Sequence, residues 1–222
     1  MRVQVFDVNE TLLDLAAMDP YFERIFGDAG LRRAWFTQMI QSALVATATG
    51  VYNNFGAHAM AALEMTAETA GVELRDEDRQ AIARQLRGLP AHPEVPGALA
   101  RLRDAGFRLA ALTNSTEQVA RAQLENAGLV DLFELVLSAD AVRRLKPAPE
   151  PYRMAAERLG VATSDLRLTA AHAWDLAGAA RAGCHTAFVA RPGKVLDPLV
   201  ERPDVIGADL DDVATGILAT DK

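Results

Sequence analysis

The strongest constraint on the fold is a regular alternation of short apolar segments with amphipathic helical patterns from about residue 92 onward. After a first strand at 3–6, the expected strands are 108–113, 134–138, 167–171, 186–190 and a weaker one around Val205 and Ile206. Helical patterns separate them, at 97–105, 116–127, 150–159, 174–182 and 209–219. Strands that alternate with helices form parallel sheets covered by helices on both faces. The sequence therefore predicts an α/β core.

Residues 15–90 interrupt this alternation, because they contain only helical patterns. These patterns lie near 19–27, 29–48, 56–70 and 76–88. An all-helical insertion after the first strand predicts a small cap domain over the sheet, and the proline-bearing segment 88–97 is the expected return linker. We therefore expect a core domain of residues 1–14 and 91–222 and a helical cap of residues 15–90.

The composition argues against several classes of partner. The formal net charge of −7 disfavours binding to nucleic acid or to an anionic membrane. The chain has one cysteine, Cys184, so it can form no internal disulfide, and a reducing cytoplasm is the expected compartment. No signal peptide or membrane-spanning apolar run is present in the sequence.

Polar residues follow several of the expected strands at the point where each strand ends. In open α/β sheets the ligand crevice lies beyond the carboxyl ends of the strands, so these residues are expected to converge there. Thr11 follows the first of them, Asp7, by four positions. The converging residues are Asp7, Thr113, Asn114, Lys146, His172 and Asp175.

Four motifs at these positions, in this order, resemble those of the haloacid dehalogenase superfamily: FDVNETLLD, LTNS, KPAPEPY and AHAWD. The resemblance covers essentially the whole chain, and it is greatest to the L-2-haloacid dehalogenases. It implies a Rossmann-like core with an inserted helical cap. It also implies hydrolysis of small (S)-2-haloacids to (R)-2-hydroxyacids and halide through an aspartyl ester. No cofactor and no metal are implied, and a homodimer is expected.

The resemblance assigns the central roles to a few side chains. Asp7 is the expected nucleophile that forms the ester. Its approach to a substrate carboxylate costs roughly 4 kcal/mol at about 4 Å and an effective dielectric constant near 20, so Lys146 is expected as its counter-charge. Asp175 is expected either to hold Lys146 or to position the water that cleaves the ester. Thr11 is expected to hydrogen-bond near Asp7.

The halide is expected to lie between a cap arginine and Asn114. We assign the arginine as Arg33, with Arg32 as an equal alternative. The remaining substrate contacts implied by the resemblance are Asn9, Thr113, Tyr152 and Trp174. Tyr52 and Phe55 of the cap could also line the pocket, although each aromatic side chain taken alone is more typical of plain core packing.

The sequence departs from the dehalogenase pattern in two motifs. Asn9 and Glu10 stand where the family usually has tyrosine and glycine, and Ala170 and His172 stand where it usually has serine and asparagine. Glu10 is expected to point to solvent. His172 is either a base that activates water for ester hydrolysis or a spacer in place of the asparagine amide, and the sequence leaves both open.

The main alternative function is a phosphatase of the same superfamily. Such phosphatases carry a second aspartate two positions after the nucleophile, where this chain has Asn9. They also place a further acidic residue in the fourth motif, where this chain has Ala171. Magnesium prefers carboxylate ligands, so the pattern favours the dehalogenase. A catalytically silent binding domain is hard to reconcile with the presence of both Asp7 and Lys146.

Overall fold

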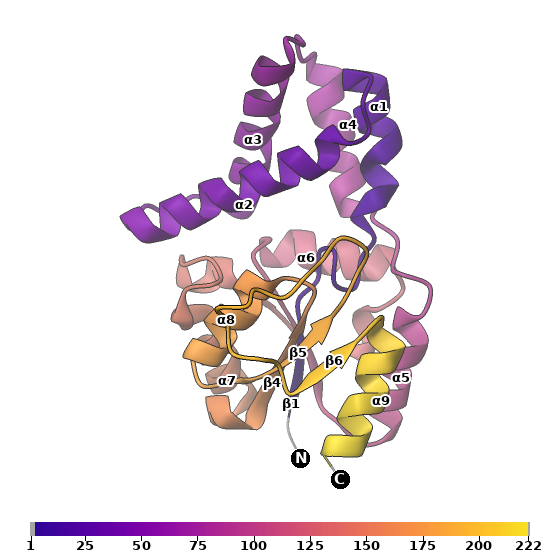
Figure 1. Cartoon of the computed structure of the whole chain (residues 1–222), viewed down its shortest axis with the longest axis vertical. Helices are drawn as coiled ribbons and strands as arrows, with labels where there is room; N and C mark the ends of the chain where they lie inside the picture. Colours follow the sequence, from indigo (N-terminus) through magenta and orange to yellow (C-terminus); the bar gives the residue numbers. More distant parts are fainter. Residues whose placement is uncertain (1–2, 222) are drawn as a thin grey trace.

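A computed structural model describes residues 3–221 of the chain and shows a parallel sheet flanked by helices (Figure 1). The sheet has six strands in the order β3-β2-β1-β4-β5-β6. This arrangement confirms the predicted Rossmann-like α/β core. The strands are β1 (Val3–Phe6), β2 (Leu109–Thr113), β3 (Leu135–Ser138), β4 (Leu166–Ala170), β5 (His185–Val189) and β6 (Val205–Gly207).

Helices cover both faces of the sheet. They are α5 (Val95–Asp104), α6 (Glu117–Asn126), α7 (Pro149–Leu159), α8 (Ala173–Arg181) and α9 (Leu210–Thr220). Neighbouring residues of β1 point to opposite faces: Val5 belongs to the apolar cluster with α7 and α8, and Phe6 to the cluster with α5, α6 and α9. β1 is therefore buried on both sides at the centre of the sheet. Short 3-10 helices occupy Leu15–Met18, Val130–Leu132, Ala139–Val142 and Thr163–Asp165.

Four helices of the inserted segment lie together beyond one end of the sheet (Figure 1). They are α1 (Asp19–Phe26), α2 (Leu31–Thr49), α3 (Phe55–Ala70) and α4 (Asp76–Arg87). Trp35 ties α2 to α3, because its indole Nε1 donates to the carbonyl oxygen of Ala59 at 2.8 Å. We therefore propose that residues 15–90 form the cap domain.

The cap joins the core through two adjacent segments of chain. The Asp14 amide donates to the Pro90 carbonyl at 2.8 Å, and the His92 amide donates to the Leu12 carbonyl at 3.0 Å. Leu13 and Ala91 form an antiparallel bridge between these segments. The entry to and exit from the cap thus lie side by side above the sheet. Within residues 3–221, no helix is long and apolar enough to cross a bilayer.

Close packing at Gly178 sets the position of helix α8 against the segment that carries Lys146. A Cβ atom on Gly178 would lie 2.5 Å from the Pro147 carbonyl oxygen and 2.7 Å from the Tyr152 hydroxyl. Real Cβ atoms do not approach other heavy atoms so closely, so any larger residue here has to displace its neighbours.

We predict that Gly178→Ala lowers the free energy of unfolding by about 1–3 kcal/mol through overpacking. The matched control is Gly97→Ala on helix α5, where the added methyl meets nothing within 4 Å. The control is expected to be neutral or to stabilise the protein by about 0.4–1 kcal/mol, because it restricts the unfolded chain. Urea unfolding measures the free energy of unfolding of the wild type and of both variants. Equal values for Gly178→Ala and Gly97→Ala would show that α8 does not pack this tightly.

Candidate active site

The ends of β1, β2 and β4 meet at one cavity under the cap. The cap contributes Phe36 and Ile40 from α2 and Phe55 from α3. The core contributes the other lining residues: Asp7, Asn9, Thr113, Asn114, Lys146, His172 and Trp174. Most of the residues singled out in the sequence therefore lie around the same space, with Asp7 at its floor.

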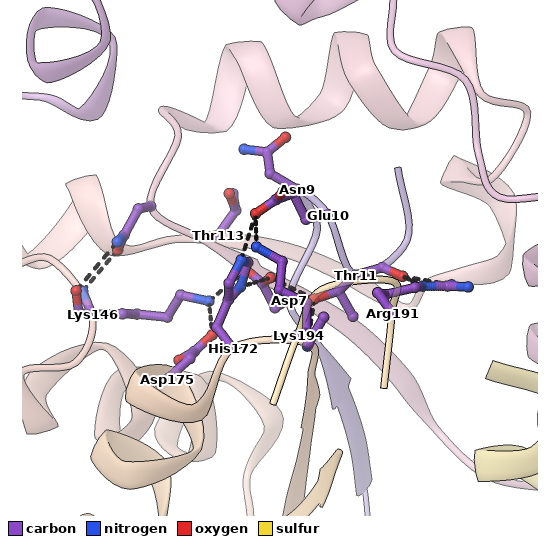
Figure 2. A network of polar contacts seen from close by, with 12 residues as sticks. Asp7, Asn9, Glu10, Thr11, Thr113, Lys146, His172, Asp175, Arg191 and Lys194 are labelled. Atoms are coloured by element: carbon purple, nitrogen blue, oxygen red, sulfur yellow. Dashed lines mark hydrogen bonds and ion pairs between the residues drawn. The ribbon is translucent and has the colours of Figure 1, made fainter. Parts of the chain in front are cut away.

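Lys146 lies between two aspartates in the interior of the core (Figure 2). Its ammonium donates to Asp7 Oδ1 at 2.8 Å and to Asp175 Oδ2 at 2.6 Å. The third donor goes to the carbonyl oxygen of Leu112 at 2.9 Å. All three charged side chains are buried. Each of the three N–H donors of the ammonium therefore has an acceptor in the protein, which fixes the position of the ammonium.

The ionisation of these groups follows from burial and from their neighbours. Burial disfavours the Asp7 carboxylate, but Lys146 and His172 outweigh it and lower the pKa of Asp7. Burial also disfavours the Lys146 ammonium, but Asp175 and Asp7 outweigh it and raise the pKa of Lys146. The nucleophile is therefore held as a carboxylate beside a cation.

Thr11 makes the expected contact with Asp7. Its hydroxyl donates to Asp7 Oδ2 at 2.7 Å and accepts from the Ala171 amide at 3.0 Å. Thr11 thus links the end of β1 to the end of β4 and orients the Asp7 carboxylate.

Asn114 and Thr113 line the cavity, and the side chains of both also hydrogen-bond to the protein backbone. Asn114 Oδ1 accepts from the Lys146 amide at 2.7 Å, and its Nδ2 donates to the Lys146 carbonyl at 3.3 Å. The Thr113 hydroxyl accepts from the Ser115 amide at 3.1 Å. Asn114 therefore fixes the backbone of the lysine as well as lining the site.

The structure does not bring Tyr152 to the cavity, in contrast to the sequence-based expectation. Its side chain is fully buried in the core cluster of α7 and α8, and its hydroxyl donates to Asp175 Oδ1 at 2.5 Å. Asp175 likewise lies behind Lys146 and does not line the cavity. Of the two roles considered for Asp175, this placement fits the one that holds Lys146.

The two cap arginines differ in where they point. Arg32 is buried, whereas Arg33 is exposed, so Arg32 is the one that faces the core. Arg32 donates to Asp19, and its guanidinium lies 3.9 Å from Glu10. Helical periodicity carries this signal, because Arg32 lies three and four positions before the buried Trp35 and Phe36. The sequence-based assignment of Arg33 overlooked it.

His172 is enclosed by rings and carboxylates. Its ring stacks on Phe36 of the cap at 5.8 Å between centroids and on Trp174 at 5.2 Å. Nε2 lies 2.9 Å from Glu10 Oε2, and Nδ1 lies 3.3 Å from Asp7 Oδ2. Burial alone would lower the pKa of His172, but Asp7 and Glu10 outweigh it and raise that pKa.

The expectation that Glu10 points to solvent was wrong. Its side chain is only 13% exposed, and it accepts from Lys194 Nζ at 2.5 Å as well as facing His172. Burial raises the pKa of Glu10, but His172 and Lys194 outweigh it and lower that pKa. Nothing local in the sequence points to this contact, since Glu10 and Lys194 lie 184 positions apart.

The segment after β5 delivers Lys194 to the site. Arg191 anchors this segment, because its NH2 group donates to the Thr11 carbonyl oxygen at 2.8 Å (Figure 2). Its NH1 group donates to Glu94 at 2.5 Å. Lys194, Arg32 and Arg33 line a separate cavity of about 390 Å³ beside Glu10. The sequence patterns identified neither Arg191 nor Lys194.

Of the two cap aromatics that the sequence suggested for the pocket, only one lines it. Phe55 lines the cavity. Tyr52 does not, because its hydroxyl donates to Asp140 of the core and its ring lies 4.7 Å from the Arg143 guanidinium. Tyr52 therefore joins the cap to the core without lining the site.

Comparison with known proteins matches residues 1–183 to a family of haloacid dehalogenase-like hydrolases. The chain belongs to this family. It is 30% identical to (S)-2-haloacid dehalogenase 1 of Pseudomonas sp. (strain CBS-3), over 87% of this chain and 86% of that protein. It is 27% identical to a haloacetate dehalogenase of Moraxella sp. (strain B), over 90% of both chains.

The fold agrees with solved structures of such hydrolases. The L-2-haloacid dehalogenase of Xanthobacter autotrophicus with chloropropionic acid covalently bound superposes with a TM-score of 0.91 over 99% of both chains, at 25% identity. Within residues 3–221 of this haloacid dehalogenase-like hydrolase, no group of three or more His, Cys, Asp and Glu side chains is placed to hold a metal ion.

The raised pKa of His172 predicts a pH-dependent contribution to stability. A group whose folded pKa exceeds the ordinary value of 6.5 stabilises the fold fully below that pH, and loses the contribution as pH rises through the folded pKa. The difference in unfolding free energy between the wild type and His172→Asn is therefore expected to be largest below about pH 6.5 and to shrink above it. Urea unfolding from pH 5.5 to 9 measures it, and a constant difference would contradict a charged His172.

Proposed function

We propose that the protein is an (S)-2-haloacid dehalogenase that converts small 2-haloalkanoic acids to (R)-2-hydroxyacids and halide. One observation carries the proposal: a buried Asp7 carboxylate contacts Lys146 at 2.8 Å at the floor of a cavity roofed by cap aromatics. The names of the relatives supply the substrate class.

In the first step an Asp7 oxygen attacks the halogen-bearing carbon from the side opposite the halogen. The bond to the halogen breaks, halide leaves with the electron pair, and Asp7 becomes an ester. The substrate carboxylate and Asp7 repel each other by roughly 4 kcal/mol at about 4 Å and an effective dielectric constant near 20. The cations Lys146 and His172, both in contact with Asp7, offset this repulsion.

The leaving halide needs donors and a dry surface. Asn114 and Trp174 line the cavity and are proposed halide contacts, together with Asn9 and Thr113 for the rest of the substrate. Arg32 is the proposed cap cation, in place of Arg33, because it is the buried one of the pair. Tyr152 supports Asp175 and does not touch substrate in this proposal.

In the second step water attacks the ester carbonyl carbon of Asp7, and the hydroxyacid leaves. The stereocentre is inverted once, in the first step, and is untouched in the second. An (S)-haloacid therefore gives an (R)-hydroxyacid.

The phosphatase alternative fits the geometry less well. Asn9 stands where the general acid would be, and an amide cannot supply that proton; its amide oxygen accepts from Gln123 Nε2 at 3.0 Å. Both oxygens of Asp175 are engaged, by Lys146 and Tyr152, and Ala171 offers no carboxylate. The residues present suit a carboxylate nucleophile beside a lysine better than a magnesium site.

We predict halide release from (S)-2-chloropropionate with formation of (R)-lactate, unchanged by EDTA. Asp7→Asn keeps the shape of the nucleophile and removes its charge, so it is the control that should abolish release while leaving the fold intact. Halide titration and chiral chromatography measure both products. A product of retained configuration, or cleavage of p-nitrophenyl phosphate with magnesium in place of halide release, would overturn the proposal.

We further predict that Arg32→Met lowers kcat/KM by about tenfold or more, since a charge-assisted contact is worth about 1.5–3 kcal/mol. Arg33→Met is the matched control on the adjacent, exposed position and should stay within about twofold of the wild type, as expected for a surface change. The two variants differ only in which face of α2 is changed. A larger loss at Arg33 would instead make Arg33 the cap cation.

We also propose a cytoplasmic homodimer. The single cysteine, Cys184, is buried and suits a reducing compartment, and the dimer follows from the family resemblance. Light scattering after size-exclusion chromatography tests the assembly, and a monomer at micromolar concentration would refute it. Cell fractionation tests the compartment.

A further inference from the structure

The Glu10–His172 pair has no counterpart in the dehalogenase pattern, which usually has glycine and asparagine at these positions. Both side chains lie at the site, in contact with each other. Nε2 of His172 meets Glu10 at 2.9 Å, and Nδ1 faces Asp7 at 3.3 Å (Figure 2). The two ring nitrogens thus face two different carboxylates.

The orientation of the ring points Nδ1 at Asp7. Stacking against Phe36 and Trp174 fixes the plane of the ring, and the contact of Nε2 with Glu10 fixes its rotation. Nδ1 is buried and makes no aligned hydrogen bond with any described protein group. It lies 3.3 Å from Asp7 Oδ2, on the carboxylate that becomes the ester.

Glu10 is held in place at some conformational cost. Its φ of 62° lies in the left-handed region, which costs a residue with a side chain about 1–2 kcal/mol. The contact with Lys194 at 2.5 Å and the proximity of Arg32 at 3.9 Å oppose this cost. A strained backbone that is kept at a site in this way is a reason to look for a function.

We propose that His172 is the base that activates the ester-cleaving water through Nδ1, and that Glu10 is the positioning residue that holds the Nε2–H proton. The inference deepens the proposed function and rests on it, because the ester exists only if Asp7 is the nucleophile. It selects one of the two roles that the sequence left open for His172.

The proton balance of the two steps suits this assignment. In the resting enzyme His172 is an imidazolium between Asp7 and Glu10. When Asp7 becomes a neutral ester, one of these anions disappears, and Nδ1 releases its proton to solvent. This is the one proton that hydrolysis of a carbon–halogen bond produces.

Neutral His172 then accepts a proton from water as the water oxygen bonds to the carbonyl carbon of the Asp7 ester. The bond between that carbon and the alcohol oxygen breaks, and the alcohol oxygen takes the proton of the new carboxylic acid. Asp7 is again a carboxylate and His172 again an imidazolium, so the cycle closes without any other reactant.

The other charges near the ring are the same in both states. Lys146, paired with Asp175, contacts the far oxygen of Asp7. Lys194 contacts the same Glu10 oxygen as His172, Oε2, and Arg32 lies 3.9 Å from the other oxygen, Oε1. Asp7 is therefore the one neighbour whose charge changes during turnover, and Glu10 is the anion that remains.

The test compares four proteins: wild type, Glu10→Gln, His172→Asn and the control Glu64→Gln. Glutamine keeps an acceptor of the same shape and removes the charge. The control removes a carboxylate from the exposed face of α3, where Glu64 pairs with Arg79 at 2.7 Å. The Asp7 ester formed from (S)-2-bromopropionate, in which the enzyme is alkylated through C2 of the acid, is followed by intact mass, and its decay rate is measured from pH 5 to 9.

His172→Asn is expected to release about one equivalent of halide and to hold the adduct, with decay slowed about 100-fold or more. In Glu10→Gln the midpoint of the decay-rate profile should move to lower pH by about one unit, because an anion that favours the protonated ring is gone. Glu64→Gln should match the wild type. Glu10→Gly, which suits the left-handed backbone, is the second variant should glutamine disturb folding.

An unmoved midpoint in both Glu10 variants, or an adduct of His172→Asn that decays at the wild-type rate, would overturn the inference. A second measurement does not depend on turnover: the pKa of the His172 ring is measured by NMR titration of the resting protein. The signal that is missing in His172→Asn identifies His172 among the four histidines. If the wild type releases no halide, the proposed function fails and the base role with it. The titration then still decides separately whether Glu10 holds His172.

Discussion

The buried Lys146 ammonium between Asp7 and Asp175 is the interaction on which the rest of the site depends. Each buried ion costs several kcal/mol in lost hydration, so a lone lysine or a lone aspartate in this place would be strongly destabilising. Contacts of 2.8 and 2.6 Å on either side make the arrangement tolerable. The consequence is rigidity, because any shift of the lysine leaves a charge unpaired.

The surrounding fold maintains this geometry from several directions. Asn114 holds both backbone polar groups of Lys146, and Tyr152 holds Asp175 from the apolar side. The close approach of Gly178 to Pro147 sets the distance between α8 and the lysine-bearing segment. Residues that look like substrate contacts in the sequence are thus partly structural, and they create a nucleophile that needs no further organisation before attack.

The cap completes the site by covering it with apolar surface. Phe36 from α2 reaches the ring of His172, and Tyr52 is hydrogen-bonded to Asp140 of the core. Excluding water strengthens the electrostatic interactions inside and removes the hydration that makes a carboxylate a poor nucleophile. The two adjacent connecting segments, paired at Leu13 and Ala91, allow the cap to be positioned without disturbing the sheet.

The sequence by itself determined the order of strands and helices and the residues at the strand ends. Hydrophobic periodicity is local, and parallel strands must present their carboxyl ends at one edge, so the sequence predicts that Asp7, Lys146 and His172 lie together. The inward position of Arg32 is also present in the sequence, in its helical spacing from Trp35 and Phe36, although the sequence-based assignment chose Arg33. Only the tertiary structure decided that Glu10 is buried, because the pairing of Glu10 with Lys194 across 184 positions leaves no local signature in the chain.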